Sequence, residues 1–145
     1  MSRELSEKNN ISRRDAREQA FILLFEMSFS DEDLSIDQIK ENALESREVE
    51  FSDYAVKVAL GVSEHREEID SLIESKLKKG WKLNRISRVS LVVLRLAVYE
   101  MLYEPTVPGG VSINEGVELS KKYSVDESAF VNGVLGAVLK ELESK

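Results

Sequence analysis

Both prolines of this 145-residue chain stand close together, at Pro105 and Pro108. Proline breaks a helix because its ring clashes with the preceding turn and its nitrogen has no hydrogen to donate. Residues 1–104 therefore contain no such break. Within them, apolar side chains recur at steps of three and four, the period of an amphipathic helix. The first such run contains Ala16, Ala20, Leu23, Leu24 and Met27. This combination predicts an all-α protein.

Three Ser-x-x-Gln/Glu tetrads mark expected helix starts, because the serine and the later Gln or Glu can cap free N–H groups at a helix N-terminus. They are SIDQ at 35–38, SINE at 112–115 and SVDE at 124–127. The segment 86–103 is apolar on most sides, which indicates a central helix. About seven helices are expected: 13–28 with Ser12 as N-cap, one from 35, about 52–61, a fourth that Gly80 ends, 86–103, 112–122 and one from 124.

One helical domain is expected over residues 12–145. A seam near Gly80 would separate subdomains of about 12–79 and 80–145. Residues 1–11 are polar and lack the apolar run of a signal peptide. We therefore expect them to form a disordered N-terminal extension.

Composition argues against catalysis and against a membrane protein. Without cysteine there is no thiolate zinc site and no disulfide framework, which favours the cytoplasm. His65 is the single histidine, so no His pair can bind a metal or activate a nucleophile. The most apolar stretch carries Arg95 and Glu100 and is too short to span a bilayer. We expect no enzymatic activity, no metal and no cofactor.

Charge is distributed unevenly along the chain. The formal net charge is -7, yet residues 75–99 contain seven basic side chains and no acidic one. That stretch carries +7, which leaves -14 for all other residues. A basic surface on an acidic protein can attract a nucleic acid or an acidic partner, although lysines also gather at helix C-termini for local reasons. The seven are Lys76, Lys78, Lys79, Lys82, Arg85, Arg88 and Arg95.

Arg13, Arg14 and Arg17 crowd the expected start of the first helix. The helix dipole favours anions there, so three cations need an explanation. Either they bind an external anion or they are ordinary solvated surface.

Two further expectations concern packing. Arg95 lies inside the most apolar helix, so its charge must be paired, and Glu100 or Glu115 are the expected partners. Gly133 and Gly136 suggest close helix packing rather than phosphate binding.

Three blocks of sequence stand out for their motifs. The first is RRDAREQAFILLFEM, and the second is WKLNRISRVSLVVLRLAVYEM, with a W-x-L-x-R lead and an L-R-x-A-x-Y-E core. The third is PGGVSINEGVELSKKYSVDESAFVNGVLG, with motifs around I-N-E and F-V-N-G-V-L. In order and spacing, over most of residues 12–139, these blocks together resemble the NusB family of bacterial transcription antitermination factors.

The resemblance implies an all-helical protein of two packed subdomains that binds RNA without catalysis. Its expected target is the boxA element of ribosomal RNA leader transcripts, bound together with NusE, a protein of the small ribosomal subunit. The complex loads onto RNA polymerase and suppresses premature termination. A protein-interaction module whose basic surface binds an acidic partner remains the alternative. The helical RNA-binding domain of ribosomal RNA cytosine methyltransferases is also similar, but we expect 145 residues to leave no room for its methyl-donor domain.

The resemblance also implies site residues. RNA would contact Arg13, Arg14 and Arg17, and also the junction of Lys121, Lys122 and Tyr123, on the same face. For the junction, an ordinary helix end with a half-buried tyrosine is an equal interpretation. Phe25 and Phe29 are expected on the NusE-facing surface, with core packing as the alternative for Phe25. Asp15 and Glu18 depart from the more basic family pattern, which predicts modest RNA affinity without the partner.

Overall fold

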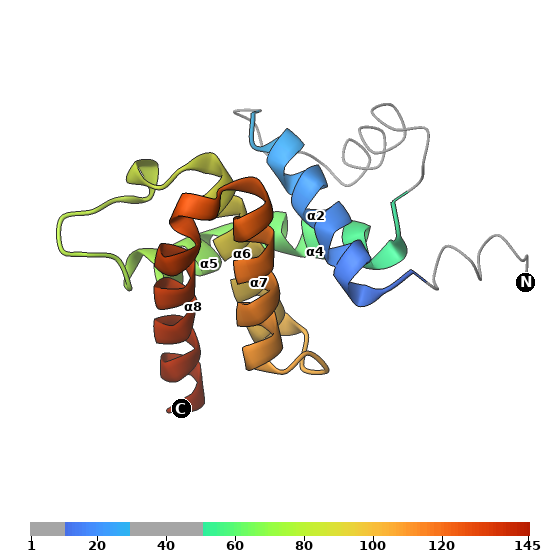
Figure 1. The fold of residues 1–145 in the computed structure, drawn as a ribbon. Coiled ribbons are helices and arrows are strands. Elements are labelled where there is room, and N and C mark those ends of the chain that lie inside the picture. The colour runs from blue at the N-terminus through green and yellow to red at the C-terminus, as the bar shows by residue number, and fades with distance from the viewer. Residues whose placement is uncertain (1–10, 30–50) are drawn as a thin grey trace, which may run out of the picture. The chain divides into compact units, whose positions relative to one another are not determined.

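The computed structural model describes residues 11–29 and 51–145, and within these ranges it contains six α-helices, two 3₁₀ turns and no strand. The expected all-α class is therefore confirmed (Figure 1). The expected helix at 35 and the N-terminal extension at 1–11 lie outside the described residues, except for residue 11. The chain divides into two compact units, Met1–Glu64 and His65–Lys145, so the division precedes the expected seam near Gly80.

In the first unit, α2 (Arg13–Met27) packs against α4 (Asp53–Glu64). The N-cap of α2 is Ser12, as expected, and its hydroxyl accepts a hydrogen bond from the Asp15 N–H at 3.0 Å. Ser52 caps α4 by accepting from the Ala55 N–H at 3.1 Å, which satisfies one free N–H group of its first turn. The buried apolar side chains of the unit come from both helices and include Ala20, Leu23, Ala55, Val58 and Ala59.

The second unit is built around α6 (Arg88–Tyr103), which contacts α5 (Arg66–Glu74), α7 (Gly109–Tyr123) and α8 (Ser128–Glu143) (Figure 1). The central position expected for this helix is confirmed. Its N-cap is Ser87, whose hydroxyl accepts from the Ser90 N–H at 3.2 Å. The buried apolar residues of α6 are Val92, Val93, Leu94, Leu96, Ala97, Val98 and Tyr99.

The two later capping boxes do not act as the sequence predicts. α7 begins at Gly109, one turn before SINE, and Ser112 is buried with its hydroxyl 3.5 Å from the Glu100 carboxylate. SVDE forms the 3₁₀ turn η2 (Val125–Glu127), and α8 begins only at Ser128. Pro108 stands at the N-cap of α7 instead, with φ -59° and ψ 143°, and no side chain of the described residues caps this helix start.

The helix before Gly80 also ends earlier than expected. α5 stops at Glu74, and residues 75–87 form a loop that contains the 3₁₀ turn η1 (Leu83–Arg85). Gly80 lies in this loop with φ +88°, a left-handed conformation that glycine adopts without a steric penalty. Within the described ranges, no helix is both long and apolar enough to cross a membrane.

Candidate nucleic-acid interface

The start of α2 exposes two of the three arginines expected there. Arg13 and Arg14 are both exposed, in the first turn. The Arg13 guanidinium lies 3.8 Å from the centroid of the Tyr54 ring, on α4. This cation–π contact restricts the side chain before any ligand arrives. The two helices of the unit therefore hold a cationic group beside free N–H groups at a helix N-terminus, an arrangement suited to phosphate.

Arg17 lies differently from its neighbours. Only 3% of it is exposed, whereas the sequence placed it on one solvent face with Arg13. The reason is its register, because Phe21 and Leu24, one and two turns later on the same side of α2, are buried as well. Its RNA role stays a prediction, and in this structure the side chain belongs to the interior.

The last turn of α7 presents a second cationic group. Lys121, Lys122 and Tyr123 are all exposed, Tyr123 with 39% of its surface, and both the RNA-contact and the half-buried-tyrosine interpretations of this junction stay predictions. The Lys122 ammonium lies 5.6 Å from the Tyr123 ring centroid, while Lys121 is 3.8 Å from Glu118. The helix dipole favours cations at this end. An exposed ring beside ammonium groups can stack on a base while they bind phosphates.

These two groups belong to different units of the chain, Arg13 and Arg14 to the first and Lys121–Tyr123 to the second. Their expected location on one face stays a prediction.

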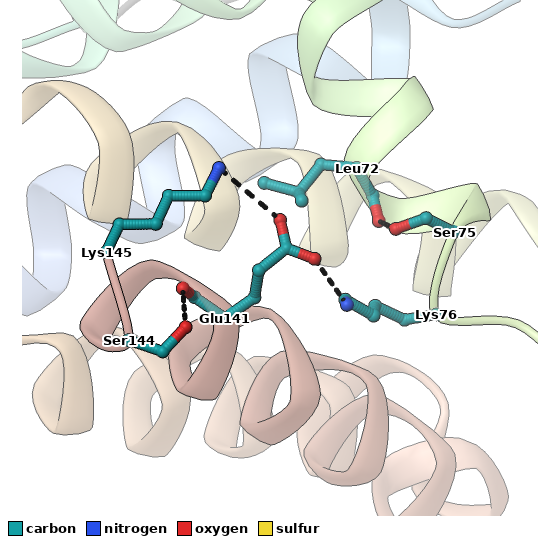
Figure 2. Close-up of polar contacts among 6 residues, drawn as sticks. All are labelled: Leu72, Ser75, Lys76, Glu141, Ser144 and Lys145. Atoms are coloured by element: carbon teal, nitrogen blue, oxygen red, sulfur yellow. Dashed lines mark hydrogen bonds and ion pairs between the residues drawn. The ribbon is translucent and has the colours of Figure 1, made fainter.

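The +7 stretch at residues 75–99 is partly neutralised by carboxylates from elsewhere. Lys76 pairs with Glu141 on α8 at 2.5 Å, and Figure 2 shows the Glu141 carboxylate between Lys76 and Lys145. The hydrogen bond from Lys76 lowers the pKa of Glu141. Arg95 binds Asp70 on α5 through Nε and Nη2, at 2.8 and 2.9 Å, so the expected pairing with Glu100 or Glu115 is wrong.

Most other cations of that stretch stay exposed, and sequence reasoning used Trp81, which stands among them, only as part of the W-x-L-x-R motif. Trp81 is 43% exposed, among basic side chains. The available signal was a lone tryptophan within a run of cations. The exposed basic residues around it are Lys78, Lys79, Lys82, Arg85 and Arg88.

A row of phenylalanines leads to the end of α2. The Phe21 and Phe25 rings stack at 5.9 Å, and the Phe25 and Phe29 rings meet edge to face at 5.1 Å. Phe21 is buried, Phe25 is intermediate and Phe29 is 64% exposed. The row thus runs from the core to an exposed ring, and partner binding by Phe25 and Phe29 stays a prediction.

Nothing in the described parts of the chain gathers three side chains able to hold a metal ion. His65 stacks on Tyr103 at 4.1 Å between ring centroids. The arrangement offers cations and exposed rings, which are groups for binding an anionic polymer.

Comparison with known proteins agrees with the sequence blocks. A profile of the NusB family matches residues 14–140. Transcription antitermination protein NusB of Clostridium novyi (strain NT) is 46% identical over 134 residues, which cover 90% of this chain and 99% of the relative. The same-named protein of Acetivibrio thermocellus is 46% identical over 133 residues, covering 90% of each chain.

Two solved structures share the fold. T. maritima NusB superposes with a TM-score of 0.77 at 39% identity, covering 90% of this chain and 92% of that one. A chain in the crystal structure of antitermination factors NusB and NusE in complex with dsRNA gives a TM-score of 0.75 at 33% identity. The match covers 89% of this chain and 96% of that one. A family profile over most of the chain and relatives at 46% identity show that this protein belongs to the NusB family.

Proposed function

We propose that this protein is an RNA-binding transcription antitermination factor. It binds the boxA element of ribosomal RNA leader transcripts together with NusE and helps RNA polymerase avoid premature termination. It acts by binding, not by catalysis, and works in the cytoplasm, where bacterial transcription takes place. Support comes from relatives named for antitermination and from a structural neighbour solved with NusE and RNA.

The observation that carries this proposal is the exposed Arg13–Arg14 pair on a chain of net charge -7. An acidic protein repels RNA in general, so cations must be concentrated where RNA binds. Arginine suits this role because its planar fork binds phosphate through two hydrogen bonds and stacks on bases. Lys121, Lys122 and Tyr123 form the second contact, and Arg17 stays a predicted RNA contact although only 3% of it is exposed in this structure.

The test is a binding assay with boxA RNA, followed by fluorescence anisotropy, with and without purified NusE. We expect weak binding by the protein alone and tighter binding with NusE, because the arginine cluster is small. The variant Arg13→Ala/Arg14→Ala should bind more weakly than Lys140→Ala/Lys145→Ala, a control of equal charge from α8 and the C-terminus. Equal affinity of both variants would overturn the arginine site.

The NusE-facing surface has a test of its own. Phe29 keeps 64% of its surface exposed, so Phe29→Ser should weaken NusE binding without lowering the melting temperature. Phe25→Leu changes the middle of the row, so it should weaken NusE binding and also lower the melting temperature. Unchanged NusE affinity in both variants would place the partner elsewhere.

The alternative, an acidic protein partner for the basic surface, makes a different prediction. Poly-glutamate would then compete with RNA at equal charge concentration, whereas an RNA-specific site prefers boxA RNA over a scrambled sequence of the same length.

A further inference from the structure

The loop at residues 75–87, here called the basic loop, keeps four cations in solvent. Lys78, Lys79, Lys82 and Arg85 are exposed, and among the described residues none has a carboxylate within ion-pairing distance. Lys76 is the exception, since Glu141 neutralises it. Concentrated positive charge on an acidic protein is costly through self-repulsion and is relieved by an anionic ligand.

Trp81 stands in the middle of these cations and is held in place. The backbone N–H of Trp81 donates a hydrogen bond to the backbone carbonyl of Lys78 at 2.9 Å. This bond closes a turn that contains Gly80, whose φ is positive. The Trp81 ring lies 6.5 Å from that of Phe130 on α8, yet 43% of the residue remains exposed. The backbone N–H of Leu83 donates a hydrogen bond to the Glu74 carboxylate at 3.3 Å. This bond connects the second half of the loop to the last residue of α5. The exposed part of the Trp81 ring therefore belongs to a turn that these contacts hold in place.

A hydrogen-bonded cluster joins this part of the unit to the end of α7. Glu127, in η2, accepts from the hydroxyls of Ser87 and Ser90 at 2.5 Å each and from Ser124 at 3.1 Å. Ser87 is the last residue of the basic loop, and Ser124 directly follows Tyr123. Phe130, which contacts Trp81, lies in the first turn of α8. The basic loop and the Lys121–Tyr123 group thus lie at the same end of the second unit.

We propose that the basic loop is a further RNA-contacting surface, continuous with Lys121–Tyr123, on which Trp81 stacks against an unpaired base. Lys78, Lys79, Lys82 and Arg85 then contact the phosphates on either side of that base. An aromatic platform flanked by cations is how proteins hold single-stranded nucleic acid, since every base has a face for stacking. This inference rests on the proposed RNA-binding function and extends its path over the second unit.

Trp81 is the single tryptophan of the chain, so its fluorescence reports on this loop alone. The full-length protein is titrated with boxA RNA that carries single-stranded flanks, and anisotropy of labelled RNA is followed in parallel. We expect quenching of Trp81 with the same midpoint as the anisotropy. RNA binding by anisotropy without any change in Trp81 emission would overturn the inference while leaving the proposed function intact. No RNA binding at all, with or without NusE, would overturn both.

Charge variants test the phosphate contacts without touching the core. Lys78→Gln/Lys79→Gln/Lys82→Gln should flatten the dependence of log affinity on log salt by about 2 units, at about 0.7 for each phosphate contact to a single strand. The matched control is Lys57→Gln/Lys140→Gln/Lys145→Gln, which removes the same charge from exposed positions outside the surface. An identical slope in both variants would contradict the proposal.

Substitution of Trp81 separates stacking from structure. Trp81→Ala should lower RNA affinity on the order of tenfold, and Trp81→Phe should restore most of it. Melting temperatures show whether loss of the Phe130 contact unfolds the loop. If poly-glutamate quenches Trp81 as strongly as RNA does at the same salt concentration, the surface fits an acidic protein instead, and the RNA assignment is wrong.

Discussion

Arg95 shows what a single residue can decide in this fold. It lies within α6, and its guanidinium forms two parallel hydrogen bonds with Asp70 of α5. Glu100 was expected as the partner, but five residues along a helix correspond to a rotation of about 140°, which points the two side chains to different sides. Glu100 faces Ser112 of α7 instead. This charged pair therefore links α5 to the central helix, beside the buried Ile69 and Ile73 of α5.

Breaking this pair should destabilise the protein. The side chains are 16% and 18% exposed, so removing one partner leaves a charge in a poorly solvated place. We expect Arg95→Met and Asp70→Asn each to lower the free energy of unfolding by about 2 kcal/mol, less than for a fully buried pair. The double variant should lose less free energy of unfolding than the two single variants lose together.

Urea unfolding followed by circular dichroism measures these changes. Arg66 also approaches Asp70, at 3.9 Å, but is 53% exposed, so Arg66→Gln should change stability by less than about 0.5 kcal/mol. A wild-type unfolding curve for Arg95→Met would show that the pair contributes nothing.

At the scale of elements, α7 has two glycines, Gly109 and Gly116, at which an added Cβ would crowd a leucine of α8. A Cβ built on Gly116 of α7 would lie 3.0 Å from Leu135 and 3.5 Å from Val93, so α7 approaches α6 and α8 only because that atom is missing. The sequence instead singled out Gly133 and Gly136, and this was wrong. Both are exposed, and nothing lies within 4 Å of their Cβ positions.

The two kinds of glycine should respond oppositely to the same change. Gly116→Ala crowds the fully buried Leu135 and should cost about 1–3 kcal/mol. Gly133→Ala meets open space in a helix interior and should add about 0.5–1 kcal/mol, because alanine restricts the unfolded chain more. Thermal and urea unfolding of both variants checks this. If Gly116→Ala raised the stability, the packing of α7 against α6 and α8 would have room for the added methyl group.

Glu127 links the start of α6 to η2 at the same scale. Hydrogen bonds from Ser87 and Ser90 lower the pKa of its carboxyl, although partial burial works in the opposite direction. The ionised form is thus favoured in the folded state. The resulting stability is present above the unfolded pKa of about 4.3 and is lost as the pH falls through the lower folded value.

Glu127→Gln should therefore lower stability at neutral pH, and the difference from wild type should shrink below about pH 4. Urea unfolding at a series of pH values measures it. Glu143→Gln, an exposed change on the same helix as Phe130, is the control and should leave the pH profile unchanged. A constant difference between Glu127→Gln and wild type down to pH 2 would refute the linkage.

For the whole molecule, the arrangement of charge matters more than its sum. The chain carries -7, yet its exposed cations form groups in both units, at the start of α2 and at the end of α7. Each phosphate contact releases counterions, so every group that contacts RNA adds to the salt dependence of binding.

Salt dependence shows whether one RNA uses both groups. Arg13→Ala/Arg14→Ala and Lys121→Gln/Lys122→Gln should each flatten the slope of log affinity against log salt by about 1.4 units, and the four-fold variant by about 2.8. Anisotropy at several salt concentrations provides the slopes. A four-fold variant no flatter than either pair would mean that the groups do not share one RNA.

The sequence by itself determined the all-α class, the central helix, the cap at Ser12 and the family. These follow from periodicity, from the absence of proline before Pro105 and from motif spacing, all of which are local or ordered along the chain. Periodicity indicates which face of a helix is apolar, but not which helix covers that face.

Tertiary structure alone decided the rest, because it joins residues that are distant in sequence. Glu141 lies 65 positions from the Lys76 that it neutralises, and Asp70 lies 25 positions from Arg95. Arg17 looked like its exposed neighbours in the sequence, but in the folded unit, where α2 packs against α4, it is buried, as Phe21 is. Burial and pairing depend on which elements pack together, and that contact, not the residue type, determines which charges remain available to a ligand.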